Sequence, residues 1–338
     1  MQEPIYILGI ESSCDDTSAA VSCNQSMLSN IVATQDIHKQ YGGVVPELAS
    51  RDHQKNIVPV VDAALKNANI SLTQINAIAF TRGPGLMGSL LVGASFAKSL
   101  SLSLNIPLIE VNHMQSHILA HFIENENGFP QFPFLCLTVS GGHTQIVKVT
   151  DYLKFELLGE TQDDAVGEAF DKAAKILGLP YPGGPLIDKY AQQGDSKKYK
   201  FPLSNMAGFS YSFSGIKTAF LYFIQNEVKK NPNFIEENLA DICASYQASL
   251  ADILFKKLLD AAQQQHIKTL TIAGGVSANS LLRKRLLELQ NQNKYKIFIP
   301  SFEYCTDNAA MIAVTGYFKY IKKEFCQLNI TSLPRYSL

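Results

Sequence analysis

The sequence has no excess of either charge, because 29 basic and 30 acidic side chains leave a formal net charge of −1. Global charge therefore does not indicate a nucleic-acid partner, and any such contact must use a local patch. Basic clusters such as SKKYK and YFKYIKK are candidates, although clusters of this kind more often form solvated surfaces. The chain has 338 residues, of which 46% are hydrophobic, and this length predicts a globular protein with two lobes.

Cysteine is sparse and scattered, with six residues and no C-x-x-C pair. This pattern argues against a disulfide framework or a cysteine-only zinc site, and it fits a reducing cytosol. The first apolar run is short and ends at Glu11, and the most apolar helix candidate, 86–104, is interrupted by Lys98. We therefore expect no signal peptide, no membrane span and a cytoplasmic location.

Two common catalytic motifs are also missing. The chain has no G-x-x-x-x-G-K-[ST] sequence, so it is not a P-loop enzyme. The stretch SGGHTQ does not match the G-x-S-x-G nucleophile elbow, which argues against a serine hydrolase.

Alternating and apolar runs place the expected elements along the chain. The first lobe opens with a small antiparallel sheet, continues with strands and helices, and ends at the proline-containing seam 128–134. After the seam the pattern restarts with a similar strand–turn–strand hairpin, which suggests a duplicated architecture with a cleft between the lobes. Expected strands are 5–12, 17–23, 27–35, 77–83, 106–113, 134–142, 144–150, 154–160, 269–275 and 296–300; expected helices are 46–68, 86–104, 164–178, 212–230, 234–265 and further helices beginning near 113, 279 and 307.

Four turns rich in glycine or acidic residues stand out: GIESSCDDT, VSGGHT, YPGGP and IAGGVSAN. Glycine pairs let the backbone approach a ligand closely, and their N–H groups can hold phosphate. A single turn of this kind is usually only a turn. Together, with two of them on matching hairpins, they favour a nucleotide site.

The stretch NHMQSH carries His113 and His117 four residues apart, and this spacing places both side chains on one face of a helix. A metalloprotease helix would carry glutamate after the first histidine as general base, but this chain has Met114 there. The remaining interpretations are another kind of metal site or two buried structural histidines.

Asp307 is expected in the first turn of the last helix, where it would serve as a metal ligand or as an ordinary helix cap. Two histidines and one carboxylate with open positions suit iron(II), with zinc second.

Several other polar residues are candidates for a functional role. Asp15 and Asp16, in the first hairpin turn, could bind a metal, orient water or act as a base, but aspartate also favours turns. Asp171 and Lys172 are either a solvent-facing pair or lie near a ligand, and His143 is a candidate for ligand contact.

These motifs, together with GEAFDKAAK, FSGIKTA and TDNAAM, occur in the order and approximate spacing of one family. Over essentially its whole length the chain resembles the universal TsaD family of tRNA threonylcarbamoyladenosine biosynthesis proteins, once labelled glycoproteases. The resemblance implies a two-lobed α/β fold of the actin-like, sugar kinase and heat-shock protein type (ASKHA), with duplicated βββαβα lobes. It implies lobes at 1–131 and 132–306, with the last helix, about 307–325, packing back across the cleft.

The resemblance also implies an acyltransferase reaction. A threonylcarbamoyl group would pass from threonylcarbamoyl-AMP to N6 of the adenosine 3′ of the anticodon, adenosine 37, in tRNAs that read codons beginning with A. The implied cofactor is one divalent metal, usually iron. The implied partners are tRNA, a TsaB-like paralogue and a TsaE-like ATPase.

Site residues follow from the same resemblance, position by position. Metal ligands would be His113, His117 and Asp307, and Asp15 matches an acidic residue needed for activity. The adenylate-binding positions would be Thr138, Val139, Ser140, Gly141, Gly142, Asp171, Gly184, Asp188 and Asn279. Rival interpretations are a small-molecule kinase or ATPase of the same fold, a metallopeptidase, and a non-catalytic assembly scaffold. The kinase would lack the metal ligands, and the scaffold would be expected to have lost both those ligands and Asp15.

Overall fold

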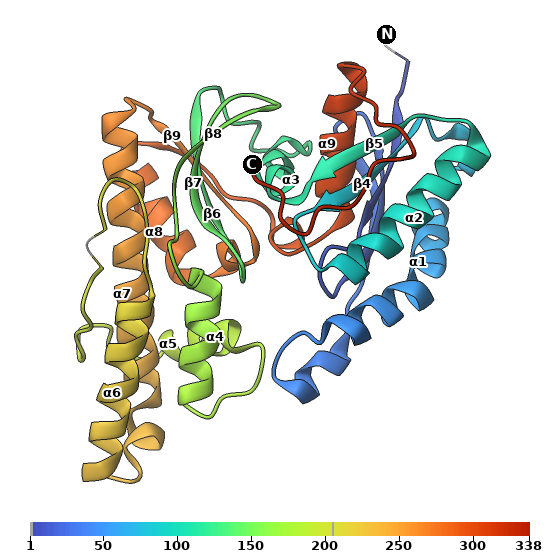
Figure 1. The fold of residues 1–338 in the computed structure, drawn as a ribbon. Coiled ribbons are helices and arrows are strands. Elements are labelled where there is room, and N and C mark those ends of the chain that lie inside the picture. The colour runs from blue at the N-terminus through green and yellow to red at the C-terminus, as the bar shows by residue number, and fades with distance from the viewer. Residues whose placement is uncertain (1–2, 205) are drawn as a thin grey trace. The chain divides into compact units, whose positions relative to one another are not determined.

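The computed structural model describes residues 3–204 and 206–338. The chain forms two compact units, each of which contains one five-stranded sheet (Figure 1). The first unit comprises Met1–Pro130, Asp151–Phe155 and Pro300–Leu338, and the second comprises Gln131–Thr150 and Glu156–Ile299.

The sheet of the first unit has the strand order β3-β2-β1-β4-β5. β1 and β2 pair antiparallel, as do β2 and β3, which confirms the predicted opening sheet; β4 and β5 then extend it in parallel. Its strands are β1 (Tyr6–Glu11), β2 (Thr17–Cys23), β3 (Ser26–Ala33), β4 (Ala77–Gly83) and β5 (Leu108–Asn112).

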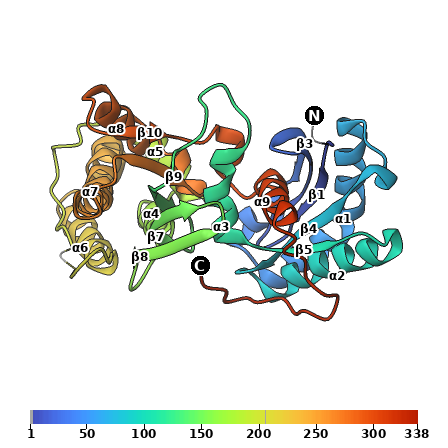
Figure 2. The same cartoon turned by 90° about the horizontal axis from the view of Figure 1, so that it is seen from above.

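Helices cover both faces of this sheet, and the alternation of side chains along β1 decides which residues meet them. Leu8 and Ile10 join a core with residues of α1 (Pro46–Ala68) and α2 (Met87–Leu104). On the opposite face Gly9 packs directly against α9 (Ala309–Ile321), and Figure 2 shows α9 and α1 on opposite sides of β1. The remaining helices of this unit are α3 (His113–Leu119), η1 (Asp36–Tyr41), η2 (Leu72–Gln74), η3 (Ala120–Phe122) and η5 (Phe302–Tyr304).

Among the described residues, α2 alone is long and apolar enough to cross a membrane by length and composition. Core helices of sheet proteins pass the same test, and α2 packs against α1 and β4 through a face that includes Leu90, Ala94 and Ala97. The helix is 33% buried, so this packing accounts for part of its apolar character.

The sheet of the second unit has the order β10-β9-β6-β7-β8, so its strands follow the same sequence of positions as those of the first sheet. β6 pairs antiparallel with β7 and parallel with β9, as β1 does with β2 and β4. The duplication predicted from the two hairpins is therefore present in the strand order. The strands are β6 (Phe134–Val139), β7 (Thr144–Asp151), β8 (Lys154–Glu160), β9 (Thr269–Ala273) and β10 (Lys296–Phe298).

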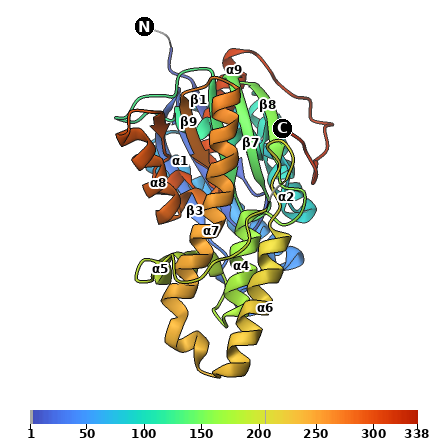
Figure 3. The same ribbon diagram turned by 90° about the vertical axis from the view of Figure 1, so that its left-hand side faces the viewer.

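One face of this second sheet carries the larger core. Leu135, Leu137 and Val139 of β6 point into it and meet apolar residues from the helices that follow β8 and β9. In Figure 3, α7 and α8 lie in front of the sheet of this unit. The helices are α4 (Val166–Ile176), α5 (Gly183–Ala191), α6 (Ser214–Lys230), α7 (Phe234–Gln264), α8 (Ser280–Asn291) and the 3₁₀ turn η4 (Gly275–Ala278).

Two details differ from the sequence prediction. The YPGGP stretch opens α5, a helix that was not expected because the segment begins with turn-forming residues. The last helix begins at Ala309 and ends at Ile321, so Asp307 precedes it instead of lying in its first turn. The cap of α9 is Asn308, whose side chain accepts a hydrogen bond from the amide of Met311 at 3.1 Å. The expectation that Asp307 lies in the first turn of this helix was therefore wrong, and the cap alternative for Asp307 does not hold because Asn308 is the cap.

Candidate functional site

The two histidines of NHMQSH lie on the short helix α3, which begins directly after β5. Asn112 caps the helix, since its side-chain oxygen accepts hydrogen bonds from the amides of Met114 and Gln115 at 2.9 and 3.1 Å. His113 and His117 are both buried, and their ring centroids lie 4.7 Å apart with the rings edge to face. The cap thus fixes the start of the turn that brings the two imidazoles together.

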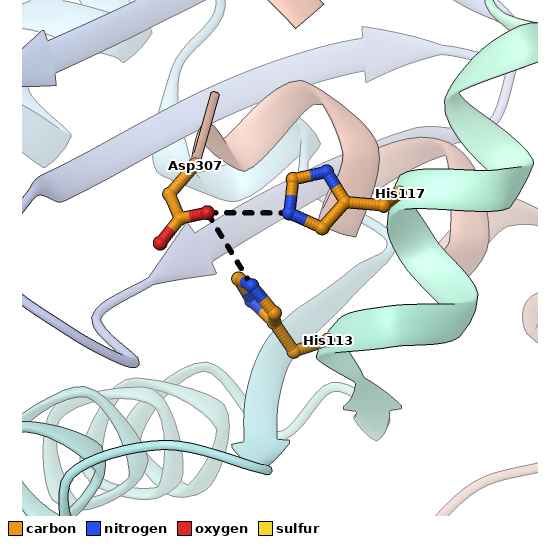
Figure 4. Close-up of side chains that lie close together, drawn as sticks. All are labelled: His113, His117 and Asp307. Atoms are coloured by element: carbon orange, nitrogen blue, oxygen red, sulfur yellow. Dashed lines mark hydrogen bonds and ion pairs between the residues drawn. The ribbon is translucent and has the colours of Figure 1, made fainter. Parts of the chain in front are cut away.

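Asp307 completes this cluster from the loop before α9. Its Oδ1 lies 3.4 Å from Nε2 of His113 and 3.2 Å from Nε2 of His117. Figure 4 shows the Asp307 carboxylate facing both imidazole rings. The three ligand atoms all lie within 4.8 Å of one another. The three residues expected to bind metal are therefore brought together within one unit, although Asp307 lies 190 positions after His117 in the sequence.

Glu11, which sequence reasoning did not select, supports the cluster from the end of β1. The residue is fully buried, and its carboxylate lies 3.1 Å from Nδ1 of His113. It also accepts hydrogen bonds from the amide of Ser13 and, at 2.6 Å, from the hydroxyl of Thr81. A carboxylate can only accept here, so it holds a proton on Nδ1 of His113 and leaves Nε2 facing Asp307. The sequence signal that could have identified Glu11 was a charged residue at the end of an otherwise apolar strand.

Charges within the cluster shift its pKa values. Burial alone would lower the pKa of His113, but the carboxylates of Asp307 and Glu11 raise it well above its ordinary value. Burial would likewise raise the pKa of Asp307, yet His113 and the hydrogen bonds from both histidines lower it. Burial, and then the charge of His113, lowers the pKa of His117. Two carboxylates against one imidazolium leave a net negative site, which favours a bound cation.

The donor set fits a divalent transition metal. Two imidazole Nε2 atoms and one carboxylate oxygen converge, and Glu11 provides for His113 the outer hydrogen bond that metal-binding histidines usually have. Nδ1 of His117 is buried and has no such partner among the described residues. Met114, next to His113, is buried and offers no proton-accepting group. The geometry therefore matches a metal site and lacks the glutamate of a metalloprotease helix.

The hairpin turn with Asp15 and Asp16 is held by several hydrogen bonds in the same unit. The carbonyl of Cys14 accepts hydrogen bonds from Nε2 of His53 at 3.0 Å and from the hydroxyl of Ser89 at 2.9 Å. Burial, followed by the charges of Asp15 and Asp307, raises the pKa of Asp16 to about 7. Its Oδ1 is buried and has no hydrogen-bond partner among the described residues. The turn thus presents two carboxyl groups from a fixed backbone.

In the second unit, Asp171 and Gly184 are direct partners. Oδ1 of Asp171 accepts hydrogen bonds from the amides of Gly183 and Gly184 at 2.9 and 3.1 Å, at the start of α5. Burial raises the pKa of Asp171, although these amides oppose the shift. Its neighbour Lys172 forms ion pairs with Asp164 and Glu168, each at 2.8 Å. The carboxylate of Asp171 therefore fixes the backbone of Gly183 and Gly184.

Asp188 and Asn279 belong to a second network in this unit, connected through Gln247. Gln247 donates to Asp188 at 3.1 Å and accepts from Asn279 at 2.8 Å. Asp188 also accepts from the amide and hydroxyl of Ser280, at 3.0 and 2.7 Å. Oδ1 of Asn279 caps α8 by accepting from the amide of Leu282. Sequence reasoning missed Gln247, a buried amide in the middle of a largely apolar helix.

The stretch Thr138–Gly142 forms the end of β6 and the following turn. Thr138 and Val139 are fully buried, whereas Gly141 and Gly142 are exposed. Gly167, in the first turn of α4, donates its amide to the carbonyl of Ser140 at 3.2 Å. The amide of His143 donates to the hydroxyl of Ser140 at 3.0 Å. Of this predicted set, the glycine pair is thus the part that lies open to a ligand.

Comparison with known proteins agrees with this arrangement. The family described as TsaD, tRNA N6-adenosine threonylcarbamoyltransferase, matches residues 26–314. Proteins of that name from Christiangramia forsetii and Riemerella anatipestifer are 65% and 59% identical to this chain. The first alignment covers 99% of this chain and 98% of the relative, and the second covers 98% of each. The chain belongs to the TsaD family. The resemblance inferred from the ordered motifs is confirmed, and with it an acyltransferase family.

Two solved structures with low sequence identity share the fold of this chain. Full-length HypF in a phosphate- and nucleotide-bound form superposes with a TM-score of 0.62 at 12% identity. That match covers 93% of this chain but only 46% of HypF, so this chain spans about half of that protein. An activator of 2-hydroxyisocaproyl-CoA dehydratase from Clostridium difficile gives a TM-score of 0.50 at 14% identity, covering 96% of this chain and 99% of the activator. The predicted ASKHA fold is thereby confirmed.

Proposed function

We propose that this chain transfers a threonylcarbamoyl group from threonylcarbamoyl-AMP to N6 of the adenosine 3′ of the anticodon. The acceptors would be tRNAs that read codons beginning with A, and the products would be threonylcarbamoyladenosine and AMP. The observation that carries the proposal is the 65% identity over 336 residues to a tRNA N6-adenosine threonylcarbamoyltransferase.

The proposed metal ligands are His113, His117 and Asp307, which would hold one divalent cation. Two imidazoles and one carboxylate with open positions favour iron(II), with zinc second. When bound, such a cation supplies Lewis-acid polarisation and a template for substrate oxygens. Glu11 keeps the His113 ring in one orientation, so that its Nε2 remains directed toward Asp307.

The proposed adenylate contacts lie in the second unit. Exposed backbone at Gly141 and Gly142 can approach a phosphate closely. The amide of Gly184, at the start of α5, already donates to Asp171, so Gly184 would contribute as a residue without a side chain. Asp171, Asp188 and Asn279 stabilise the loops and helix starts around these positions through the hydrogen bonds described above. Thr138 and Val139 are buried in β6 and would act by placing the turn.

The reaction needs no covalent nucleophile from the protein, because an acyl adenylate is already activated. The amine nitrogen forms a bond to the carbamoyl carbon, the bond from that carbon to the phosphate oxygen breaks, AMP leaves, and the amine releases one proton to the solvent. What the protein supplies is alignment and electrostatic stabilisation. We propose Asp15 as the carboxylate required for this step, presented from the turn that His53 and Ser89 hold in place.

We also propose the partners, the location and the domains of this chain. A chain with net charge −1 would rely on partners for part of its tRNA contact, and a TsaB-like paralogue and a TsaE-like ATPase would supply that surface. All six cysteines are free, which fits a cytoplasmic location. The predicted lobes, 1–131 and 132–306, would act as two domains.

The function is tested by reconstitution with threonylcarbamoyl-AMP, tRNA and the partner proteins, with modified adenosine measured by mass spectrometry. We expect Asp15→Ala to abolish modification while the circular dichroism spectrum and melting temperature stay unchanged. Asp62→Ala, at an exposed position of α1, is the control and should retain full activity. Undiminished modification by Asp15→Ala would remove Asp15 from the mechanism, and no modification by wild type would refute the proposed reaction.

A further inference from the structure

The last ten residues, Asn329–Leu338, form an extended segment that we term the C-terminal strap. The strap is attached to β4: the amide of Leu333 donates to the carbonyl of Arg82 at 2.8 Å, and Nε of Arg82 donates to the carbonyl of Thr331 at 2.9 Å. Figure 2 shows this dark red segment running past β5 and ending near α3. All of these residues belong to the first unit.

The end of the strap reaches the cap of the histidine-bearing helix. Nδ2 of Asn112 donates to the carbonyl of Ser337 at 3.0 Å and lies 3.5 Å from that of Tyr336. The hydroxyl of Tyr336 donates to Glu110 at 3.0 Å, and its ring lies 5.5 Å from the guanidinium of Arg82. The oxygen of the same Asn112 amide caps α3. One side chain therefore joins the strap to the first turn of the helix.

A second connection runs from the strap to His113 itself. The carbonyl of Pro334 accepts from the amide of Gly85 at 3.2 Å, and the amide of Leu86 donates to the carbonyl of Ser13 at 2.7 Å. Gly85 packs so closely that a Cβ there would lie 2.4 Å from the Ser13 carbonyl oxygen. The hydroxyl of Ser13 lies 3.2 Å from Nδ1 of His113. A displacement of the strap would therefore be transmitted through Gly85 and Ser13 to Nδ1 of His113.

α3 has seven residues, and helices this short are unstable in isolation, so the groups at its ends determine its placement. We propose that the C-terminal strap is a positioning element for the metal site, with Asn112 and Tyr336 as its positioning residues. It acts by holding the start of α3 and the Ser13 turn, and hence both histidine ligands. The inference rests on the metal site of the proposed function.

The test uses the full chain loaded with Co²⁺, whose visible absorption reports ligand geometry. Asn112→Ser keeps a side chain that caps helices well but removes the donor to the strap, and a second variant lacks Arg335–Leu338. For both we expect a changed Co²⁺ spectrum and Co²⁺ affinity about tenfold weaker, as for loss of outer-shell support. Asn329→Ser and Arg335→Ala, at exposed positions of the strap, are the controls and should match wild type.

Failure of the metal site and failure of the positioning role give different results. If wild type binds no Co²⁺, the metal site itself is refuted, and this inference fails with it. If wild type binds Co²⁺ and both variants bind it with the same affinity and spectrum, the strap has no positioning role. Should the shortened chain fail to fold, Tyr336→Phe, which loses only the hydroxyl bonded to Glu110, provides the same comparison beside Asn112→Ser.

Discussion

At the scale of single residues, Glu11 and His113 depend on each other. A buried carboxylate is costly unless it is paired and hydrogen-bonded, and Glu11 has partners in His113, Ser13 and Thr81. The same contact fixes the proton on Nδ1 of His113, which leaves Nε2 for a metal. The orientation of the imidazole is therefore set by β1 as well as by α3.

Replacing Glu11 with glutamine should weaken metal binding without removing a metal ligand. The amide keeps the size of the side chain but can present N–H to His113 Nδ1, which would favour the wrong tautomer. We expect Zn²⁺ affinity to fall by about 10- to 100-fold in competition with a chromophoric chelator. Glu47→Gln, at an exposed position of α1, should leave affinity unchanged. Equal affinities for the two variants would show that Glu11 does not orient the histidine.

Metal binding should also release a proton. The raised pKa of His113 means that its Nε2 carries a proton near neutral pH, and a cation must displace that proton, whereas the pKa of His117 is lowered. Affinity should therefore rise about tenfold per pH unit while His113 is protonated and become flat above its pKa. Calorimetry in two buffers of different ionisation enthalpy measures the release, expected to be about one proton near pH 7. Zero release at that pH would contradict the charge assignment.

Residue-scale prediction from sequence succeeded where spacing constrains geometry. The four-residue interval placed His113 and His117 on one helical face, as the structure shows. For Asp307 the sequence left a metal ligand and a helix cap as alternatives, and only the family resemblance favoured the ligand, since no periodicity connects positions so far apart in the chain. Glu11 was missed because its role depends on which strand end lies beside α3, and that is a tertiary contact.

At the scale of elements, β1 and α9 meet at a close contact. Gly9 lacks a side chain where α9 crosses the strand, and a Cβ there would lie 2.5 Å from the carbonyl oxygen of Ala309. The two nearest atoms, the carbonyl oxygen of Ala309 and the amide nitrogen of Ala313, belong to the backbone of α9, so the helix itself would have to move. Asp307 stands two residues before this helix, which connects the packing of α9 to the metal site.

Gly9→Ala should therefore affect stability and metal binding together. We expect the free energy of unfolding to fall by about 1–3 kcal/mol, the usual cost of overpacking, together with weaker Co²⁺ binding. Gly215→Ala is the matched control, because a Cβ on this residue of α6 meets nothing within 4 Å. Chemical denaturation and Co²⁺ titration of the two variants measure both effects. A Gly9→Ala protein as stable as wild type would mean that α9 can shift at no cost.

Element boundaries were predictable where local signals are strong. α1 begins with Pro46 at its first position and is followed by Asn69 in a left-handed conformation, both of which are typical signals of helix ends. α5 was missed because YPGGP reads as a turn, and its start is stabilised from outside by the carboxylate of Asp171. Such a cap supplied by a distant residue leaves no local pattern.

At the scale of the whole molecule, the two sheets share one strand order. The repeated hairpins were visible in the sequence, because β1–β2 and β6–β7 both read as strand, short turn, strand. The position of α9 on the first sheet, after ten strands have been formed, could be expected only from the family resemblance. The duplication can thus be predicted from local sequence patterns. The packing of the last helix on the first sheet cannot, because it depends on contacts between distant parts of the chain.

The central claim is that this TsaD-family chain holds a divalent metal at His113, His117 and Asp307. The most direct measurement is the metal content, by inductively coupled plasma mass spectrometry, of wild type beside the His113→Ala/His117→Ala variant. We expect about one iron or zinc ion per wild-type chain and almost none in the folded variant. Wild-type protein purified without chelators that contains no metal, or a variant that retains as much as wild type, would contradict it.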